Sequence, residues 1–402
     1  MILKMRIKNF YSVADEVMVD FTVTKNNPKG FTYKSTGIKN YDERGSLINV
    51  MIGPNASGKT NIVKALSALK HLIADSQADP EEAGVYYYWP NALHADEPSE
   101  LGVKFSADKK LFEYNFVFDR RRILKEELAE YSRVSERFTA KKVFTRSWND
   151  KEQVYKARFY YPELVELLTK DLRSNASIIS VAKQLPRYEF AQKISSYWQQ
   201  CVASNIAFTN WYPEPKNRID FLDKAIDNKS LREKIDDLLR RFDIGYNGIE
   251  RYDMELDGQK HYAYFVSHTY ADKKFSTVWQ EESEGTKRMF KILEQAISVL
   301  SKKDGVMIID ELDSGLHPDL AEAIVDLFQD KDTNVNKTQL IFNTHDHRIL
   351  STLDKQQIFL VEKDTAGSTD VWRLDEVEGV RADDNYYTKY MAGAYAAKPR
   401  IK

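Results

Sequence analysis

Much of the N-terminal part of the chain alternates between apolar and polar positions in the manner of β-strands. Every second residue is apolar over much of residues 1–24 and again over 101–120, where two such runs flank Asp108-Lys-Lys110. Side chains of a strand point alternately to its two faces, so this period of two predicts half-buried strands. We expect a hairpin at residues 1–24, an antiparallel pair at 101–120 and more sheet up to about residue 161.

A short apolar strand followed by an amphipathic helix interrupts this alternation. The residues from Leu47 to Ile52 are nearly all apolar and lie between Gly45 and Gly53, which predicts a buried strand. From Thr60 onward, apolar residues recur at intervals of three and four positions, the spacing of one helical face. The two patterns together predict a strand–loop–helix unit.

Helical periodicity dominates between about residues 162 and 241. Three stretches are amphipathic, namely Leu164–Leu172, Phe190–Val202 and Leu231–Phe242. The turn-rich segment Trp211-Tyr-Pro-Glu-Pro215 separates the last two. This range is predicted to be an inserted helical arm.

Strands return at Tyr262–Tyr270 and Phe275–Gln280, and a helix, a strand, a helix and a strand follow through Phe342. This βαβ rhythm is typical of a parallel sheet with helices on its faces. The chain is therefore predicted to have an α/β fold, with a mixed sheet and helices, an antiparallel β subdomain and the inserted helical arm.

Composition narrows the class of protein. Hydrophobic residues make up 42% and charged residues 30% of the chain, as in ordinary globular proteins. No apolar run approaches the ~20 residues of a membrane-spanning helix, and the alternating N-terminal residues lack the apolar core of a signal peptide. The one cysteine, Cys201, excludes an intramolecular disulfide. We expect a soluble, cytoplasmic protein with no membrane partner.

The strongest chemical signal lies between the predicted strand and helix and matches the phosphate-loop pattern G-x-x-x-x-G-K-[ST]. Its residues are Gly53, Pro54, Asn55, Ala56, Ser57, Gly58, Lys59 and Thr60. Backbone N–H groups of such a loop surround phosphates, and the following helix adds its dipole. Lys59 would place its charge at the β and γ oxygens, and the Thr60 hydroxyl can bind Mg²⁺. The segment predicts a site for ATP and Mg²⁺.

A second buried-strand pattern, Val306-Met-Ile-Ile, ends in two carboxylates, Asp310 and Glu311. In phosphoryl transfer, one acid can hold the Mg²⁺ shell while another group polarises the attacking water. We assign the first role to Asp310 and the second to Glu311. An acidic pair can also be the solvated end of a strand, but the phosphate loop favours the chemical role.

Two further segments are candidates for contact with the nucleotide. Ser283-Glu-Gly285 precedes an apolar helical face that begins at Met289, and a helix N-terminus binds anions. His345 follows a strand that ends near Phe342, at the sheet edge where ligands of α/β folds gather. It is predicted to sense the γ-phosphate. A capped helix and a structural histidine are the respective alternatives.

The order of these motifs resembles the ABC-type ATPases of the RecF/SMC/OLD branch. The motifs are the phosphate loop, a long insertion, Ser283-Glu-Gly285, Ile309-Asp-Glu311, Asp313 with Leu-His-Pro318, and Thr344-His345. More narrowly, the chain resembles the stand-alone AAA-type ATPases of bacterial anti-phage and abortive-infection operons, of the RloA, AbiL and PARIS types. The segment from Tyr390 to Tyr395 is similar to the closing motif of that family.

This resemblance implies an ATP hydrolase and assigns its residues. The catalytic residues would be Lys59, Glu311 and His345, the Mg²⁺ ligands Thr60 and Asp310, and further nucleotide contacts Ser283, Gly285 and Asp313. It also implies a homo-oligomer, a head-to-tail dimer or larger, in which the Ser-Glu-Gly signature of one protomer closes on the ATP of another. The implied partner is an effector protein, a TOPRIM-type nuclease, switched in anti-phage defence by a phage-derived trigger or DNA.

The resemblance divides the chain into three parts. Residues 1–161 would form the N-terminal half of the ATPase head, with the phosphate loop and the β subdomain. Residues 162–241 would form the helical insertion. Residues 242–402 would form the C-terminal half, with the signature, the two acids and the histidine loop.

Other functions fit parts of the pattern. A RecF/SMC-type repair ATPase would act on DNA directly, but Lys plus Arg (59) nearly balance Asp plus Glu (61), and no long heptad array is present. A nuclease with its own TOPRIM domain would need more than the about sixty residues that follow His345. A non-hydrolysing scaffold would not require Glu311. The opening hairpin and the Ser-Glu-Gly signature resemble the RecF/SMC branch better than transporter ATPases.

Two segments depart from the family pattern. Tyr11 stands where many relatives have a basic residue after Asn-Phe, and Tyr88-Trp-Pro90-Asn91 lies where relatives carry a Pro-Phe element. No glutamine matches the family's Q-loop. The sequence alone assigns no role to either segment.

Overall fold

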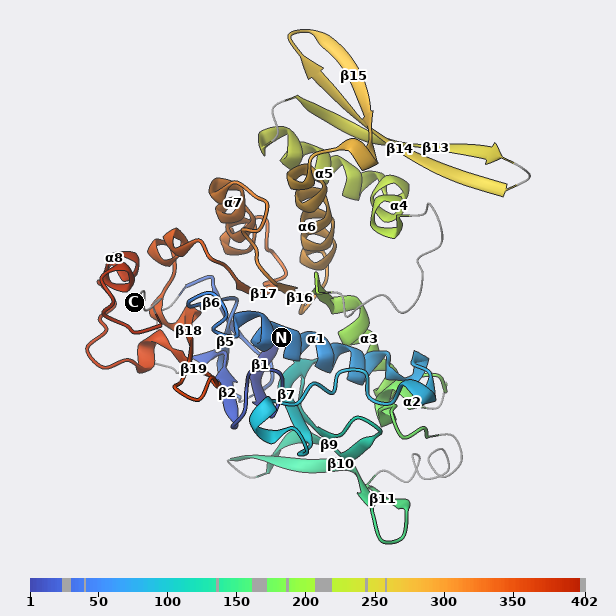
Figure 1. Cartoon of the computed structure of the whole chain (residues 1–402), viewed down its shortest axis with the longest axis vertical. Coiled ribbons are helices and arrows are strands. Elements are labelled where there is room, and N and C mark those ends of the chain that lie inside the picture. The colour runs from blue at the N-terminus through green and yellow to red at the C-terminus, as the bar shows by residue number, and fades with distance from the viewer. Residues whose placement is uncertain are drawn as a thin grey trace.

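The computed structural model arranges the chain as four sheets with helices between and around them (Figure 1). It describes residues 1–23, 30–39, 41–134, 137–160, 172–185, 188–206, 219–242, 245–256 and 259–397. The predicted α/β fold with an antiparallel β subdomain is confirmed. Among the helices of these residues, none has the length and apolar character needed to cross a membrane.

A six-stranded sheet forms the centre of the molecule, in the order β12-β16-β17-β6-β18-β19. Its strands are β6 (Ile48–Ile52), β12 (Val202–Ser204), β16 (Val306–Ile309), β17 (Gln339–Asn343), β18 (Ile358–Lys363) and β19 (Thr369–Arg373). All neighbours are parallel except β19, which runs antiparallel to β18. Every residue of β6, β16 and β17 is buried, as expected of a parallel sheet covered on both faces.

Alternate residues of these central strands face two different cores. Ile308 and Ile341 belong to a core shared with α1 (Lys59–Ala74). Their neighbours Met307 and Phe342 belong to a second core, shared with α6 (Glu284–Leu300) and α7 (Pro318–Gln329). Because side chains alternate between the two faces of a strand, α1 packs on one face of the sheet and α6 and α7 pack on the other.

A seven-stranded antiparallel sheet packs on the other side of α1, in the order β11-β10-β9-β8-β7-β1-β2. Its strands are β1 (Ile2–Lys8), β2 (Val17–Asp20), β7 (Ser99–Ala107), β8 (Lys110–Phe118), β9 (Ile123–Val134), β10 (Arg137–Asn149) and β11 (Val154–Phe159). The predicted hairpin at residues 1–24 and the predicted pair at 101–120 are confirmed as β1–β2 and β7–β8. A small sheet, β3 (Thr22–Val23), β5 (Arg44–Ser46) and β4 (Tyr33–Ser35), lies beside them.

The range predicted to be a helical insertion is helix-rich but not purely helical. It contains α2 (Ile178–Ala182), α3 (Glu189–Ser196), a π-helix (Tyr197–Cys201), α4 (Asp220–Asp227) and α5 (Lys229–Phe242). However, β12 also lies in this range and pairs with β16 in the central sheet, so the segment is not separate from the core. Three residues are too few to show a strand period, which is why the sequence pattern missed β12. The predicted helix Leu164–Leu172, except for Leu172, and the turn at residues 211–215 lie outside the described residues.

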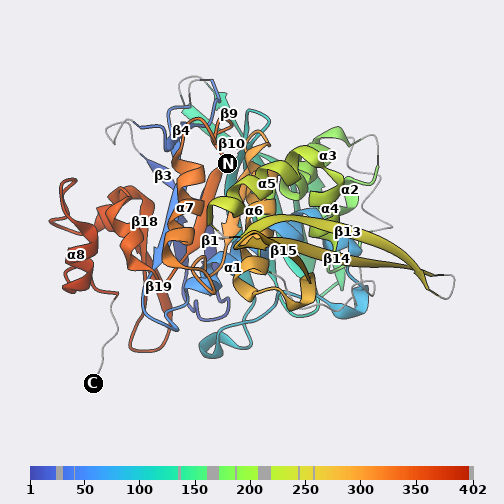
Figure 2. The same ribbon diagram turned by 90° about the horizontal axis from the view of Figure 1, so that it is seen from above.

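A third antiparallel sheet stands away from the central one (Figure 1). It consists of β13 (Tyr246–Leu256), β14 (Gln259–Tyr270) and β15 (Lys273–Val278). In the views of Figures 1 and 2 it extends to the opposite side of the molecule from α8 (Tyr386–Met391). Strands were predicted for β14 and β15 but not for β13, whose apolar residues are interspersed with charges.

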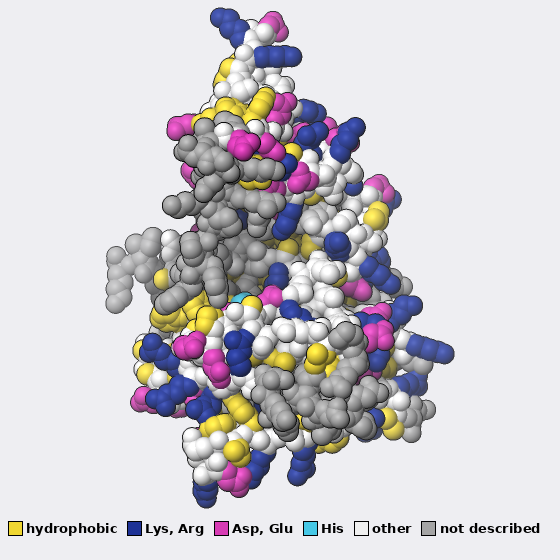
Figure 3. All heavy atoms as spheres, turned by 90° about the vertical axis from the view of Figure 1, so that its right-hand side faces the viewer, with side chains coloured by type: hydrophobic (Ala, Val, Ile, Leu, Met, Phe, Trp, Pro, Cys, Tyr) yellow, Lys and Arg dark blue, Asp and Glu magenta, His cyan; other side chains and the backbone are white. Residues whose placement is uncertain are grey.

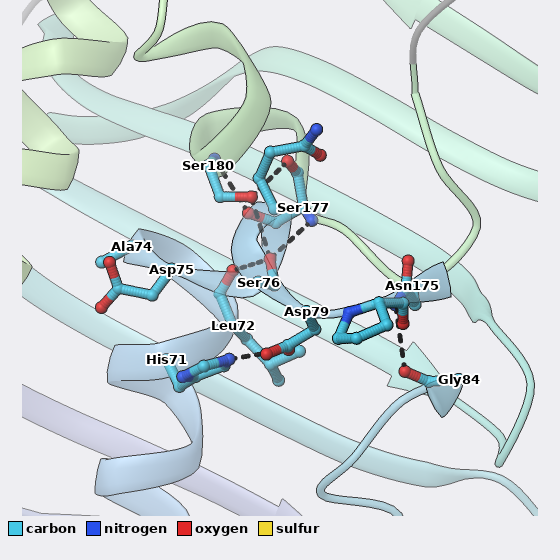
Figure 4. A network of polar contacts seen from close by, with 12 residues as sticks. His71, Leu72, Ala74, Asp75, Ser76, Asp79, Gly84, Asn175, Ser177 and Ser180 are labelled. Atoms are coloured by element: carbon cyan, nitrogen blue, oxygen red, sulfur yellow. Dashed lines mark hydrogen bonds and ion pairs between the residues drawn. The ribbon is translucent and has the colours of Figure 1, made fainter. Parts of the chain in front are cut away.

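The far end of α1 is tied to α2 by a polar junction (Figure 4). The Ser76 hydroxyl donates to the carbonyl of Leu72 at 2.7 Å, accepts from the Ser177 backbone N–H at 2.9 Å and lies 2.9 Å from Ser180 Oγ. Nearby, His71 Nε2 lies 2.7 Å from an Asp79 carboxylate oxygen. The helix that follows the phosphate loop is therefore anchored at its other end as well.

A buried ion pair holds the chain that leads into α2 against the seven-stranded sheet. Arg146 Nη2 lies 2.7 Å from Glu126 Oε2, and both side chains have no exposed surface. The Glu126 carboxylate also accepts hydrogen bonds from the Tyr114 hydroxyl and from the Ile178 backbone N–H, and Arg146 donates to the carbonyl of Ala176 at 2.8 Å. Burial raises the pKa of Glu126, and the Arg146 charge opposes that rise.

Replacing Arg146 by Met should leave the Glu126 carboxylate without its cation in an apolar interior. We expect the free energy of unfolding, measured by urea titration, to fall by about 3–5 kcal/mol. The control is Lys142→Met, whose ammonium lies 2.8 Å from Glu127 while its side chain is 48% exposed; that loss should stay below about 1 kcal/mol. Equal losses in the two variants would contradict this view of the buried pair.

Candidate functional site

The predicted functional segments meet at one edge of the central sheet. Strands β16, β17 and β6 are consecutive neighbours and parallel, so the loops that follow them leave from the same edge. These loops carry residues 310–317, 344–346 and 53–58, respectively. Ligands of open α/β sheets bind at this carboxyl edge.

The phosphate loop leaves no room for side chains at its two glycines. A Cβ on Gly53 would lie 2.0 Å from the Val361 carbonyl oxygen, and one on Gly58 would lie 2.1 Å from Thr369 Oγ1. Gly58 also has a φ of 106°, a conformation that favours glycine. Val361 belongs to β18 and Thr369 to β19, so these two strands restrict the conformation of the loop.

Three polar side chains outside the motif are linked by hydrogen bonds beside the same loop, and one of them, Thr369, is bonded to the loop itself. Thr369 Oγ1 donates to the Ser57 carbonyl at 2.8 Å and lies 2.7 Å from Ser12 Oγ. Asn61 Nδ2 donates to the same Ser12 oxygen at 2.7 Å. Sequence reasoning missed Ser12 and Thr369, because both lie far from the loop along the chain and belong to no spacing pattern.

Lys59 is folded back over the loop. Its Nζ donates to the carbonyls of Gly53 and Pro54, at 2.9 Å each, and the residue is only 5% exposed. Burial lowers the pKa of Lys59, while the negative charges of Asp313, Glu311 and Asp310 act in the opposite direction. The Ser57 hydroxyl is also buried and has no hydrogen-bond partner among the described residues. An ammonium, an unpaired hydroxyl and a helix N-terminus form a donor set that fits a polyanion.

The two acids after β16 are held by one asparagine. Asn343, the fully buried last residue of β17, donates from Nδ2 to Asp310 Oδ1 at 2.6 Å and accepts from the Glu311 backbone N–H at 2.6 Å. The side-chain amide of Asn205, which follows β12, accepts from the Asp310 backbone N–H at 2.8 Å and donates to the Asp310 carbonyl at 3.0 Å. Neither asparagine was predicted, although Asn343 is a polar residue at the end of an apolar strand.

Glu311 lies at a strained backbone position. Its φ is 52°, a left-handed conformation that is uncommon for a residue with a side chain. The residue is exposed, and its carbonyl accepts a hydrogen bond from Arg288 of α6. Such strain concentrates at functional sites, and here it accompanies the acid predicted to polarise water.

Asp313 joins the loops that follow β16 and β17. Its Oδ1 accepts from the Thr344 hydroxyl at 2.7 Å and from the His345 backbone N–H at 3.0 Å. The His345 side chain is exposed. The structure thus brings Asp313 and His345 together at the phosphate-loop edge.

His347 lies two residues after His345. Burial and the charge of Lys59 lower the pKa of His347, and its ring centroid is 4.8 Å from that of Tyr390 in α8.

The signature segment begins α6. Ser283 caps this helix, its hydroxyl accepting from the Thr286 backbone N–H at 3.0 Å. A Cβ on Gly285 would lie 3.1 Å from the Gly315 carbonyl oxygen, so the helix start touches the loop after the two acids. Among the described residues, neither Ser283 nor Gly285 forms a hydrogen bond with residues 53–60 of its own chain.

Comparison with known proteins identifies the family of the chain. The family model described as "AAA domain, putative AbiEii toxin, Type IV TA system" matches residues 48–351, which confirms the ATPase resemblance drawn from the motifs. None of the curated proteins matches the sequence.

Two solved structures are similar over most of the chain. A crystal structure of an SMC head bound to the C-winged helix domain of ScpA covers 92% of this chain and 97% of its own, with 14% identity and a TM-score of 0.49. An SMC head domain from Thermotoga maritima covers 92% of this chain and 98% of its own, with 13% identity and a TM-score of 0.39.

Proposed function

We propose that this protein binds and hydrolyses ATP at the edge of its central sheet. The chain belongs to the family of AAA domains described as putative AbiEii toxins of type IV TA systems. The observation that carries this proposal is the loop around Lys59, where a buried ammonium and a helix N-terminus share one sheet edge with the acids Asp310 and Glu311. These are the two halves of a phosphoryl-transfer site.

Each residue has one task in this proposal. Lys59 would exchange its two carbonyl partners for the β and γ oxygens of ATP. Glu311 would accept a proton from the attacking water, and His345 would contact the γ-phosphate. Thr60 and Asp310 would hold Mg²⁺, which neutralises phosphate charge when bound.

Variants of Lys59 and Glu311 should separate binding from turnover. Lys59→Ala removes the cation and should weaken ATP binding measured by calorimetry. Glu311→Gln keeps the shape of the site but loses the base, so ATP should still bind while phosphate release falls by at least about a hundredfold. Hydrolysis at the parent rate by Glu311→Gln protein would show that another group is the base.

Asn343→Ala is a second check on the same acids. It removes the amide that fixes both of them without touching the phosphate loop. We expect turnover to fall about 10- to 100-fold, as for other residues that orient a metal ligand, with ATP affinity largely retained. A thermal melt of the variant separates this effect from unfolding.

We further propose that the active unit is a head-to-tail oligomer. Ser283 and Gly285 make no hydrogen bond to residues 53–60 of their own chain among the described residues. The exposed start of α6 is therefore available to the nucleotide of a second protomer, where its dipole would favour the γ-phosphate.

Mixing two inactive variants should test this arrangement. A heterodimer of Lys59→Ala and Ser283→Arg protein retains one shared site in which both halves are intact. Part of the ATPase activity should therefore return on mixing. If mixed oligomers form and no activity returns, each protomer completes its own site.

The output of the ATPase, in this proposal, is the control of a separate effector, a TOPRIM-type nuclease of anti-phage defence. The family description, "AAA domain, putative AbiEii toxin, Type IV TA system", supports a defence role. Among the described residues, no group of three or more His, Cys, Asp or Glu side chains could hold a metal for nuclease chemistry. The RecF/SMC alternative, direct action on DNA, has less support, because Lys plus Arg (59) nearly balance Asp plus Glu (61) in the sequence. On the one face shown in Figure 3, the two kinds of charge lie among each other.

Co-expression with the product of the neighbouring gene should test this output. We expect a stable complex with ATP-dependent nuclease activity and no cleavage by the isolated chain. Metal-dependent cleavage of DNA or RNA by the isolated chain, absent from its Asp310→Ala variant, would show that the nuclease lies in this protein.

A further inference from the structure

The loop after β16 bends sharply beside the helix that carries the signature. Glu311 has a φ of 52° and Gly315 a φ of 68°, so two positions of this loop are left-handed and only the second is a glycine. A left-handed backbone is unfavourable for a residue with a side chain. Such a residue keeps this conformation where its surroundings impose it.

Arg288 of α6 holds both peptide units that flank the Glu311 Cα. Its Nη2 donates to the carbonyl of Glu311 and, at 3.2 Å, to the carbonyl of Asp310. The peptide of the Asp310 carbonyl also donates its N–H to Asn343 Oδ1 at 2.6 Å, and the Glu311 carbonyl accepts from the Ser314 N–H at 3.0 Å. Because φ and ψ of a residue set the angle between its two flanking peptides, one guanidinium nitrogen fixes the strained conformation of Glu311.

The guanidinium lies between α6 and the loop. Its Nε is buried and has no hydrogen-bond partner among the described residues. A Cβ on Gly315 would lie 3.8 Å from Arg288 Cδ, and one on Gly285 would lie 3.1 Å from the Gly315 carbonyl oxygen. A buried N–H without an acceptor costs stability, which argues against a purely stabilising role for this side chain.

From these contacts we infer that Arg288 is a positioning residue for the proposed base, because it holds the Glu311 backbone in the conformation that directs the carboxylate at the attacking water. The inference rests on the proposed function and deepens it by naming the group that directs Glu311. Turnover is sensitive to small displacements of a reacting group. Since α6 begins at the Ser283 cap, Arg288 also connects the signature of a chain to the base of the same chain.

Arg288→Met removes the donor and keeps a long side chain that can pack against the loop. The affinity for ATP, measured by titration calorimetry, should stay within about twofold of the parent, because the phosphate loop is unchanged. The turnover number should fall about 10- to 100-fold, as for the loss of a hydrogen bond from a charged donor. A thermal melt checks that the variant is folded.

A double-mutant cycle with Glu311→Gln tests whether Arg288 acts through the base. If Arg288 serves to place the Glu311 carboxylate, its removal has little further effect once that carboxylate is gone. Single-turnover hydrolysis by the Arg288→Met, Glu311→Gln double variant should therefore lie within about threefold of that by the Glu311→Gln variant. A general structural defect would instead multiply the two losses.

Lys291→Met is the matched control on the same helix. Lys291 lies about one turn further along α6, is exposed and places its ammonium 6.0 Å from the centroid of the Phe221 ring. Its loss also removes a cation from α6 but no contact to the acids, so turnover should be unchanged. If Arg288→Met protein does not fold, Arg288→Lys enters the same cycle, with a smaller expected loss because it keeps a cationic nitrogen donor.

The outcomes separate this inference from the proposed function. Turnover at the parent rate by folded Arg288→Met protein would overturn the inference and leave the ATP site intact, and so would fully multiplied losses in the double variant. If the parent does not hydrolyse ATP, or if Glu311→Gln protein does so at the parent rate, the proposed function or its base fails, and the role of Arg288 fails with it.

Discussion

The close approach of β18 and β19 to the phosphate loop is the constraint on which the rest of the site depends. The Val361 carbonyl and the Thr369 side chain occupy the space that a Cβ at Gly53 or Gly58 would need. The loop can pass this point only with glycine, and it then curls so that Lys59 reaches back to the Gly53 carbonyl. The position of the cation is thus set by strands that contribute no predicted site residue.

The helix that starts from this loop connects the site to the whole molecule. Apolar residues of α1 belong to the core that joins the central sheet to the seven-stranded sheet, and its last turn is tied to α2 through Ser76. A helix buried along both faces and anchored at both ends can move only with its neighbours. The helix that follows the phosphate loop is therefore held in place by both sheets and by α2.

The sequence predicted the local units well and the long-range ones poorly. The strand–loop–helix around Lys59 and the two early hairpins follow from periods of two and 3.6 within one short window. The roles of Asn343, Ser12 and Thr369 depend on contacts between strands distant in sequence, which no local period records. The edge strand β12 was missed because three residues carry no period. The roles assigned to Lys59, Glu311 and His345 stay predictions.

The buried pair of Arg146 and Glu126 also constrains how this chain can diverge among its relatives. Both side chains are fully buried and each is hydrogen-bonded to the backbone near α2. Losing either partner alone leaves an uncompensated charge in the interior, whereas exchanging both for apolar residues can be neutral. Evolutionary replacement at one position is therefore conditional on the other, and the two should covary in any set of homologous sequences.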